Sequence, residues 1–209
     1  MFNKKLFELG GIVASIVLIV FGIGAIALGI NGRTTVRDSL KLEKIVGSPD
    51  MTRDAIAAEA KKAGLKNIVL PGGDVAGKSI DTGEKARWFA GYMRIHALEA
   101  SGGLTYAEMP RFATADGKGT NDAAAAQKYP SGAPMSNSAR DIWVTETALT
   151  TALNTSYMAE QISLFGIAVG GAFLLVGLAF GAAALRGVRI ARPSLAIARG
   201  RRPASVDIG

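Results

Sequence analysis

His96 is the only histidine of the chain, and it lies three residues before Glu99. Side chains three residues apart lie on one face of a helix, so this pair would place an imidazole beside a carboxylate. Such groups can bind a metal ion, or they can act as a base and an orienting acid beside a nucleophile. The pair therefore raises two hypotheses, a metal centre and a catalytic base, and each needs further residues.

Neither hypothesis finds those residues in the sequence. His96 is the only candidate base for a triad, and the chain has no cysteine to serve as a thiol nucleophile or a metal ligand. Metal centres recruit several His, Cys or acidic ligands, and the spacing of Asp74, Asp81 and Glu84 indicates no such set. We therefore predict no catalytic residue, no metal ligand and no cofactor, and we expect a structural role for His96.

Residues 72–79, GGDVAGKS, satisfy the phosphate-loop pattern G-x-x-x-x-G-K-S. A working phosphate loop follows a core strand and leads directly into a helix whose amide groups hold the phosphates. Here Asp81 and Gly83 fall in a stretch that delays the next helix, and no magnesium-binding partner is evident. We expect a turn at this position.

Two long stretches contain no charged residue, residues 9–32 and residues 161–185. Each is long enough to cross a hydrocarbon core of roughly 30 Å as a helix, so we predict two transmembrane helices. The first stretch could instead be a signal peptide, because Lys4 and Lys5 precede it and Ala25 and Ala27 resemble a cleavage site. Its apolar length exceeds that of a signal core, which favours an uncleaved anchor.

The basic residues of the two tails predict the orientation in the membrane. Lys4 and Lys5 precede the first stretch, and six arginines follow the second: Arg186, Arg189, Arg192, Arg199, Arg201 and Arg202. Because positive residues near a span stay on the cytoplasmic side, we place residues 1–8 and 186–209 in the cytoplasm and residues 33–160 outside the plasma membrane. Topology also accounts for most of the net charge of +7, so we predict no nucleic-acid partner.

Small residues form a stripe along each predicted span. At about 100° per residue they share one face, which lets helix backbones approach closely. The stripes either pack against each other within one chain or bind other membrane subunits or a second copy. Neither span contains an ionisable group, which argues against a transporter or an ion channel. The stripes comprise Gly11, Ser15, Gly22, Ala25 and Gly29 in the first span, and Gly166, Gly170, Gly177 and Gly181 in the second.

The region between the spans divides into short elements. Residues 33–47 are close to alternation and predict an extended segment or strand, and residues 65–70 predict a second short strand. A short helix capped by Thr52 or Asp50 lies between them. Thr105 and Glu108 form a capping box at a turn. Residues 113–138 are rich in Ala, Gly, Ser, Asn and Pro, which predicts a flexible loop.

Two further helices carry the aromatic side chains of this region. One opens at the Asp81–Glu84 capping box and runs to about residue 100. Its two apolar rows are Trp88, Tyr92 and Ile95, and Phe89, Met93 and His96. The other follows a Ser138–Asp141 capping box and runs unbroken from about 139 through the second span to about 190. Its buried stripe is predicted as Ile142, Leu149 and Leu153, with aromatic contacts from Trp143 and Tyr157. We propose Trp88, Tyr92, His96 and Trp143 as a candidate interaction surface.

Four motifs resemble a family of small two-span membrane proteins from actinobacteria: residues 43–45, 76–78, 96–109 and 154–170. The resemblance covers the spans and the second half of the external region, and it implies this topology. Members are often labelled as aromatic ring-opening dioxygenase subunits. Those enzymes need iron and a histidine-rich site, which one histidine cannot provide.

These observations predict a mainly α membrane protein with two transmembrane helices. They also predict a small helical or α+β extracytoplasmic domain, with the second span continuing a long helix. We expect a non-enzymatic structural or accessory subunit of a cell-envelope assembly, in contact with membrane lipids and with other subunits or a second copy. The alternative is an extracytoplasmic module that binds or senses a small ligand or lipid, favoured by an apolar pocket between the two helices. A metal-dependent enzyme using His96 is the third hypothesis.

Overall fold

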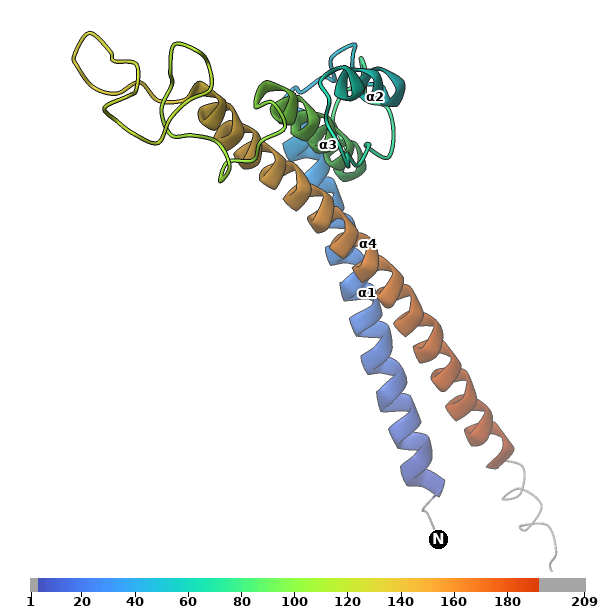
Figure 1. Cartoon of the computed structure of the whole chain (residues 1–209). Coiled ribbons are helices and arrows are strands. Elements are labelled where there is room, and N and C mark those ends of the chain that lie inside the picture. Colours follow the sequence, from blue (N-terminus) through green and yellow to red (C-terminus); the bar gives the residue numbers. More distant parts are fainter. Residues whose placement is uncertain (1–3, 192–209) are drawn as a thin grey trace, which may run out of the picture. The chain divides into compact units, whose positions relative to one another are not determined.

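The computed structural model describes residues 4–191, with side chains described from 8 to 186, and these residues fold into four helices (Figure 1). The helices are α1 (Lys4–Leu42), α2 (Arg53–Lys62), α3 (Gly83–Ala100) and α4 (Ser138–Ala191). Between residues 4 and 191 the β-structure is limited to isolated bridges. The chain is therefore mainly helical, as predicted. Most of the basic C-terminal tail lies outside the described residues.

Two helices, α1 and α4, are long and apolar enough to cross a membrane. The predicted continuity of α4 from about 139 to 190 is confirmed. The predicted extended segment at 33–47 is wrong, because α1 continues to Leu42. Val36 and Leu40 lie one helical turn apart, and Leu40 is 5% exposed in the core. Burying this i, i+4 pair on one helix face stabilises the helix over the strand that alternation predicted.

The contacts divide the chain into two compact units. Unit 1 contains the described residues up to Asn31 together with those from Ser163 onward, and unit 2 is Gly32–Ile162. Both long helices contribute residues to both units. The apolar stretches belong to unit 1, and the candidate functional residues outside the stripes belong to unit 2.

In unit 1 the two small-residue stripes pack against each other. A Cβ atom on Gly22 would lie 2.8 Å from the carbonyl oxygen of Gly170, and one on Gly29 would lie 2.6 Å from that of Ser163. The Ser15 hydroxyl donates a 2.7 Å hydrogen bond to the carbonyl oxygen of Gly177. These contacts leave room for a hydrogen atom only, so glycine is required at the crossing. The same seam includes Gly11, Ala25, Gly166 and Gly181.

Unit 2 has its own hydrophobic core. Its fully buried side chains come from α2, α3 and the segment that joins them: Ile56, Val75, Ile80, Tyr92 and Ile95. The predicted Thr52 cap of α2 is confirmed, since its hydroxyl accepts from the Ala55 amide. The Asp81 cap predicted for α3 is wrong. Thr82 caps that helix instead, by accepting from the Lys85 amide.

The segment that joins α2 to α3 contains no strand, so the strand predicted at 65–70 is wrong. Asn67 has a positive φ of 57°, which breaks the run. Ile68 and Leu70 pack partly against the core, and Val69 is 86% exposed. Side chains therefore alternate over 68–70 as in a strand, although no neighbouring strand pairs with them.

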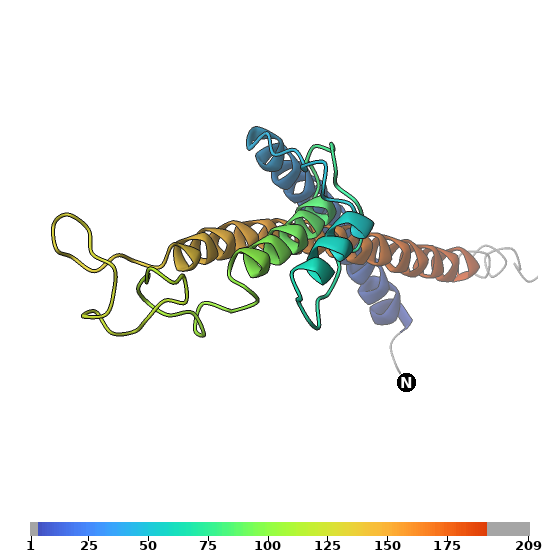
Figure 2. The same cartoon turned by 45° about the horizontal axis from the view of Figure 1, so that its top comes forward.

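Residues 101–137 connect α3 to α4 without a helix (green to yellow in Figure 2). Backbone hydrogen bonds join distant parts of this connection, including Ala113 to Met135 and Met135 to Gln127. Half of the predicted Thr105–Glu108 capping box is present. The Glu108 carboxylate accepts from the Thr105 amide at 2.7 Å, but the Thr105 hydroxyl donates to that carboxylate and does not accept from the Glu108 amide. The predicted Ser138 cap of α4 is wrong by one residue.

Asn137 forms the cap of α4. Its side-chain oxygen accepts from the Ala139 amide, and its side-chain nitrogen donates to the Pro110 carbonyl. An asparagine at this position satisfies one amide that the first helical turn leaves without a partner. The same side chain therefore starts α4 and ties it to the preceding connection.

Candidate functional site

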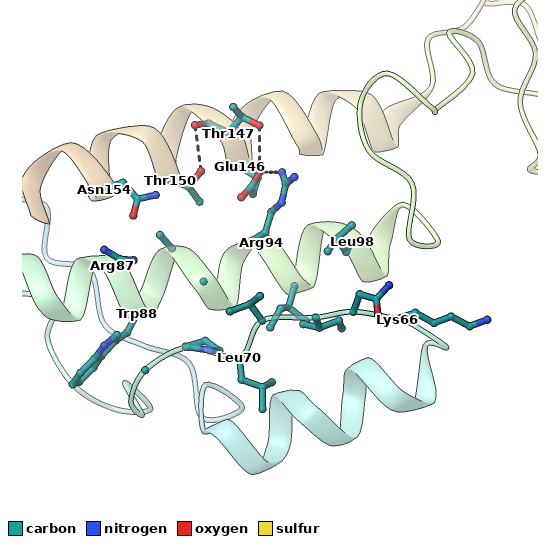
Figure 3. A pocket seen from close by; sticks show the side chains of 18 residues that line it. Lys66, Leu70, Arg87, Trp88, Arg94, Leu98, Glu146, Thr147, Thr150 and Asn154 are labelled. Carbon is teal, nitrogen blue, oxygen red and sulfur yellow. Dashed lines mark hydrogen bonds and ion pairs between the residues drawn. The ribbon is translucent and has the colours of Figure 1, made fainter. Parts of the chain in front are cut away.

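A groove in unit 2 has a volume of about 680 Å³ (Figure 3). One side is formed by residues 66–72, which run next to α3, and the other by one face of α4. The lining residues of α3 are Arg87, Trp88, Ala90, Gly91, Arg94, Ile95 and Leu98, and those of α4 are Glu146, Thr147, Thr150 and Asn154. The groove therefore combines apolar side chains with polar and charged groups from both helices and from the segment at 66–72.

Glycines bring the segment at 66–72 against α3. A Cβ atom on Gly91 would lie 3.1 Å from the Pro71 ring, and one on Gly72 would lie 2.7 Å from the indole nitrogen of Trp88. Gly73 meets the other end of the same indole, also at 2.7 Å. Trp88 thus packs flat against the turn that ends the segment. Trp88 is half-buried and helps to shape the groove.

Glu146 is the most deeply buried charged group of the groove, with 3% of the residue exposed. One carboxylate oxygen lies 3.4 Å from Arg94, and Figure 3 shows the two side chains pointing toward each other. The Arg94 guanidinium also stacks 4.0 Å from the Trp143 ring centroid. The other oxygen of Glu146 is buried and has no hydrogen-bond partner among the described residues. Such a group is costly unless a donor reaches it.

Positive charge outweighs negative charge along the groove. Lys66, Arg87 and Arg94 line it, against one acid, Glu146. Arg87 lies 4.7 Å from the ring centroid of Tyr157, a stacking contact that positions its guanidinium. A ligand with acidic groups therefore matches the groove better than a basic one.

A smaller cavity of about 490 Å³ lies on the other side of Glu146, between α3 and α4. Its lining is mostly apolar, with Met93, Ala97, Ala100 and Ile142 beside the polar residues. Ile142 is 47% exposed, so its predicted place in a buried stripe is wrong.

Glu160 anchors the helices that form the groove, and 4% of the residue is exposed. One oxygen accepts from Arg33 at 2.9 Å and from Arg37 at 2.8 Å. The other oxygen accepts from the backbone amide of Gly83, the first residue of α3, at 2.6 Å. One carboxylate thus joins α1, α3 and α4 inside unit 2. Sequence reasoning missed this ion pair, although the sequence contained a signal for it. Arg33 and Arg37 lie one helical turn apart just after the first apolar stretch, and Glu160 lies just before the second.

The predicted interaction surface is only partly a surface. Tyr92 is fully buried, and its hydroxyl donates to the Gly73 carbonyl at 3.2 Å. Trp143 is 6% exposed and lies beneath Arg94. Both positions are therefore corrected from surface to core. The broad aromatic face of α3 packs inside unit 2 because its apolar rows have partners there.

His96 is half-buried, and the structure brings acids to it that the sequence did not predict. Its Nε2 atom lies 3.1 Å from Asp50, and Glu59 completes a group whose ligand atoms all lie within 4.8 Å of one another. A hydrogen bond from the Ser48 hydroxyl, helped by the nearby His96, holds the pKa of Asp50 below its usual value. Sequence reasoning did not find this group, because its three residues are far apart in the sequence and lie in different elements.

The turn predicted for residues 72–79 is confirmed. Gly77 has a positive φ of 66°, and the Lys78 ammonium donates to the backbone carbonyl of Asp74. The α3 helix begins only at Gly83, so its amides do not follow the loop directly. This arrangement differs from a phosphate loop, which opens a helix.

Comparison with protein-family models, with curated proteins and with solved structures finds no match to this chain. The resemblance to the two-span actinobacterial family stays a prediction. The functional conclusion therefore rests on the geometry of unit 2.

Proposed function

We propose that this protein is a non-enzymatic accessory subunit of a membrane assembly, which binds a partner protein through the groove of unit 2. In this proposal α1 and α4 cross the plasma membrane, both termini are cytoplasmic, and unit 2 lies outside. The observation that carries the proposal is the groove itself, a preformed surface with an extended chain segment along one side and a polar helix face along the other.

The packing in unit 1 occupies the surfaces that are best suited to bind another helix. The small-residue stripes are the strongest helix-docking signal in the sequence, and they are used against each other, as the Gly22–Gly170 approach shows. A partner therefore needs another surface. The exposed side chains of the apolar stretches are large aliphatic groups together with phenylalanines such as Phe21 and Phe165, which suits contact with membrane lipids.

The groove suits an extended, acidic segment of the partner. Between residues 66 and 70, no backbone amide or carbonyl group forms a hydrogen bond to another described part of the chain. An extended peptide can pair with such a segment as an added strand, with Val69 exposed at its centre. Lys66, Arg87 and Arg94 supply the complementary charge.

A purification experiment with two matched variants tests the proposal. Thr150 lines the groove, and Thr151 is the next residue, exposed and outside the lining. Thr150→Trp fills the groove, whereas Thr151→Trp adds the same bulk elsewhere. After purification in mild detergent, mass spectrometry should find a stoichiometric partner with the wild type and with Thr151→Trp, and much less of it with Thr150→Trp. A wild-type chain that purifies as an isolated monomer would refute the proposal.

A small ligand or lipid is the second candidate occupant, favoured by the unpartnered oxygen of Glu146 between the groove and the apolar cavity. A hydroxyl or ammonium group of the ligand would satisfy that oxygen. Native mass spectrometry distinguishes the two candidates. A small mass adduct that is lost in Thr150→Trp supports the ligand, and a protein adduct supports the subunit.

A further inference from the structure

Three side chains with metal-binding atoms meet on one side of unit 2, and each comes from a different element. Asp50 precedes α2, Glu59 lies within α2, and His96 lies within α3. We propose that Asp50, Glu59 and His96 form a binding site for a divalent transition metal, with zinc as the preferred ion. The proposal is independent of partner binding in the groove.

The geometry is close to that of a metal centre. Ligand atoms about 2.1 Å from a tetrahedral zinc ion lie about 3.4 Å from one another. The Nε2 atom of His96 and the carboxylate of Asp50 already lie 3.1 Å apart. All three ligand atoms lie within 4.8 Å of one another, so closure requires the long side chain of Glu59 to move by little more than an ångström.

A second acid lies on the far side of the imidazole. The carboxylate of Glu99 is 4.0 Å from the Nδ1 atom of His96, within the range of an ion pair. A histidine that binds a metal through one nitrogen commonly directs the other N–H toward a carboxylate, which fixes the orientation of the ring and its protonation. Glu99 therefore lies where a group that orients the imidazole is needed, which would explain the three-residue spacing between His96 and Glu99.

The ligand set selects the class of ion. One imidazole nitrogen and two carboxylates suit zinc, and manganese binds such sites more weakly. Calcium and magnesium prefer oxygen ligands alone. Three protein ligands leave a coordination position for water. The residues are half-buried, so an ion can reach them from solvent.

A bound ion would join the start of α2, its middle and α3. The segment between these two helices contains residues 66–72, the side of the groove without helical structure. Because the ion would bind the folded arrangement, in which α2 and α3 lie together, zinc should stabilise unit 2 against unfolding. This stabilisation is measurable without any partner protein.

Zinc titration tests the site. The full-length, untagged chain in detergent is first treated with a chelator to remove any bound metal and is then titrated with zinc. The wild type should bind one zinc ion per chain by competition with a fluorescent zinc indicator, with manganese at least about tenfold weaker and calcium undetectable. His96→Gln, Asp50→Asn and Glu59→Gln should each weaken zinc binding at least about tenfold. Asp54→Asn, an exposed acid on α2, is the matched control and should bind as the wild type does.

Thermal unfolding separates the metal site from a simple His96–Asp50 ion pair. With a metal site, zinc raises the melting temperature of the wild type and of Asp54→Asn, and leaves that of His96→Gln unchanged. An ion pair alone gives a wild type that zinc does not affect. Either that result, or equal zinc affinity in all variants, overturns the proposal. Circular dichroism spectra that match the wild type confirm that each variant is folded before it is compared.

Discussion

Alanine at Gly170 should destabilise the helix pair of unit 1, whereas alanine at Gly171 should not. A Cβ atom on Gly170 would lie 2.7 Å from the carbonyl oxygen of Gly22 and 3.0 Å from the backbone nitrogen of Ile26. Both neighbours are backbone atoms of a helix, which cannot rotate away. A Cβ atom on Gly171 meets no atom within 4 Å. The two adjacent glycines therefore form a matched pair.

The magnitude follows from the overlap. Ordinary contacts between heavy atoms are about 3.5 Å, so the helices must separate by roughly 0.8 Å at the crossing. Overpacking of this kind costs about 1–3 kcal/mol. The higher helix propensity of alanine offsets up to about 1 kcal/mol of that cost. We expect Gly170→Ala to lose about 1–2 kcal/mol, and Gly171→Ala to be neutral or slightly more stable.

Unfolding of the purified chain in detergent, followed by circular dichroism, measures the difference, and sedimentation gives the oligomeric state. Gly22→Ala and Gly24→Ala provide the reciprocal pair on α1, since a Cβ atom on Gly24 also meets nothing within 4 Å. Equal stability of Gly170→Ala and Gly171→Ala would refute the packing argument. A loss of oligomer without a loss of monomer stability would show that the stripes act between chains.

Three further substitutions test the other contacts. Ser15→Ala removes the hydrogen bond to Gly177 and should cost about 0.5–1.5 kcal/mol in the same unfolding assay, whereas no change would show that the bond contributes nothing. Glu160→Ala leaves two arginines and the Gly83 amide without their acceptor and should cost about 3 kcal/mol, seen as a lower melting temperature; a loss below about 1 kcal/mol would contradict its role as an anchor. Burial of the Tyr92 hydroxyl, together with the nearby Asp74 carboxylate, raises the pKa of Tyr92 to about 12, above the unfolded value of about 10. The stabilisation from protonated Tyr92 is thus complete below pH about 10 and is lost as pH rises toward 12, by up to about 3 kcal/mol. Chemical unfolding measured across that pH range should show a smaller decline in the free energy of unfolding for Tyr92→Phe than for the wild type. An equal decline would refute the assignment.

Features with a local cause were predictable from the sequence. The two apolar stretches, the unbroken α4 and the Thr52 cap each depend on residues within a few turns of one another. The turn at residues 72–79 was predictable for the same reason, because glycine spacing and the delayed helix both lie in one short stretch. Hydrophobic length, capping and glycine content act before any tertiary contact forms.

The strand predicted at 33–47 failed because two periodicities competed. Val36 and Leu40 fit a helix, and the charges between them imitate alternation. Whether residues 33–42 form a helix or a strand depended on which of their side chains the core of unit 2 could bury. Leu40 is buried in that core, and α1 is helical there. Local pattern alone cannot decide such a case, because burial against other elements outweighs weak propensity.

The candidate site required the tertiary structure throughout. Glu160 and Arg33 are 127 residues apart in sequence, yet they form a hydrogen bond. Asp50 and Glu59 lie near His96 only because α2 packs on α3. Tyr92, which the sequence placed on a surface, is buried in the core of unit 2.

The sequence by itself determined the apolar helices, their small-residue stripes and the scarcity of histidine and cysteine, since these are properties of composition and spacing. The tertiary structure decided that the stripes meet within one chain, that Glu146 is buried beside a groove, and that His96 has acidic neighbours. The physical reason is that charge pairing and close packing depend on distances in space, which helix periodicity fixes only within a single element.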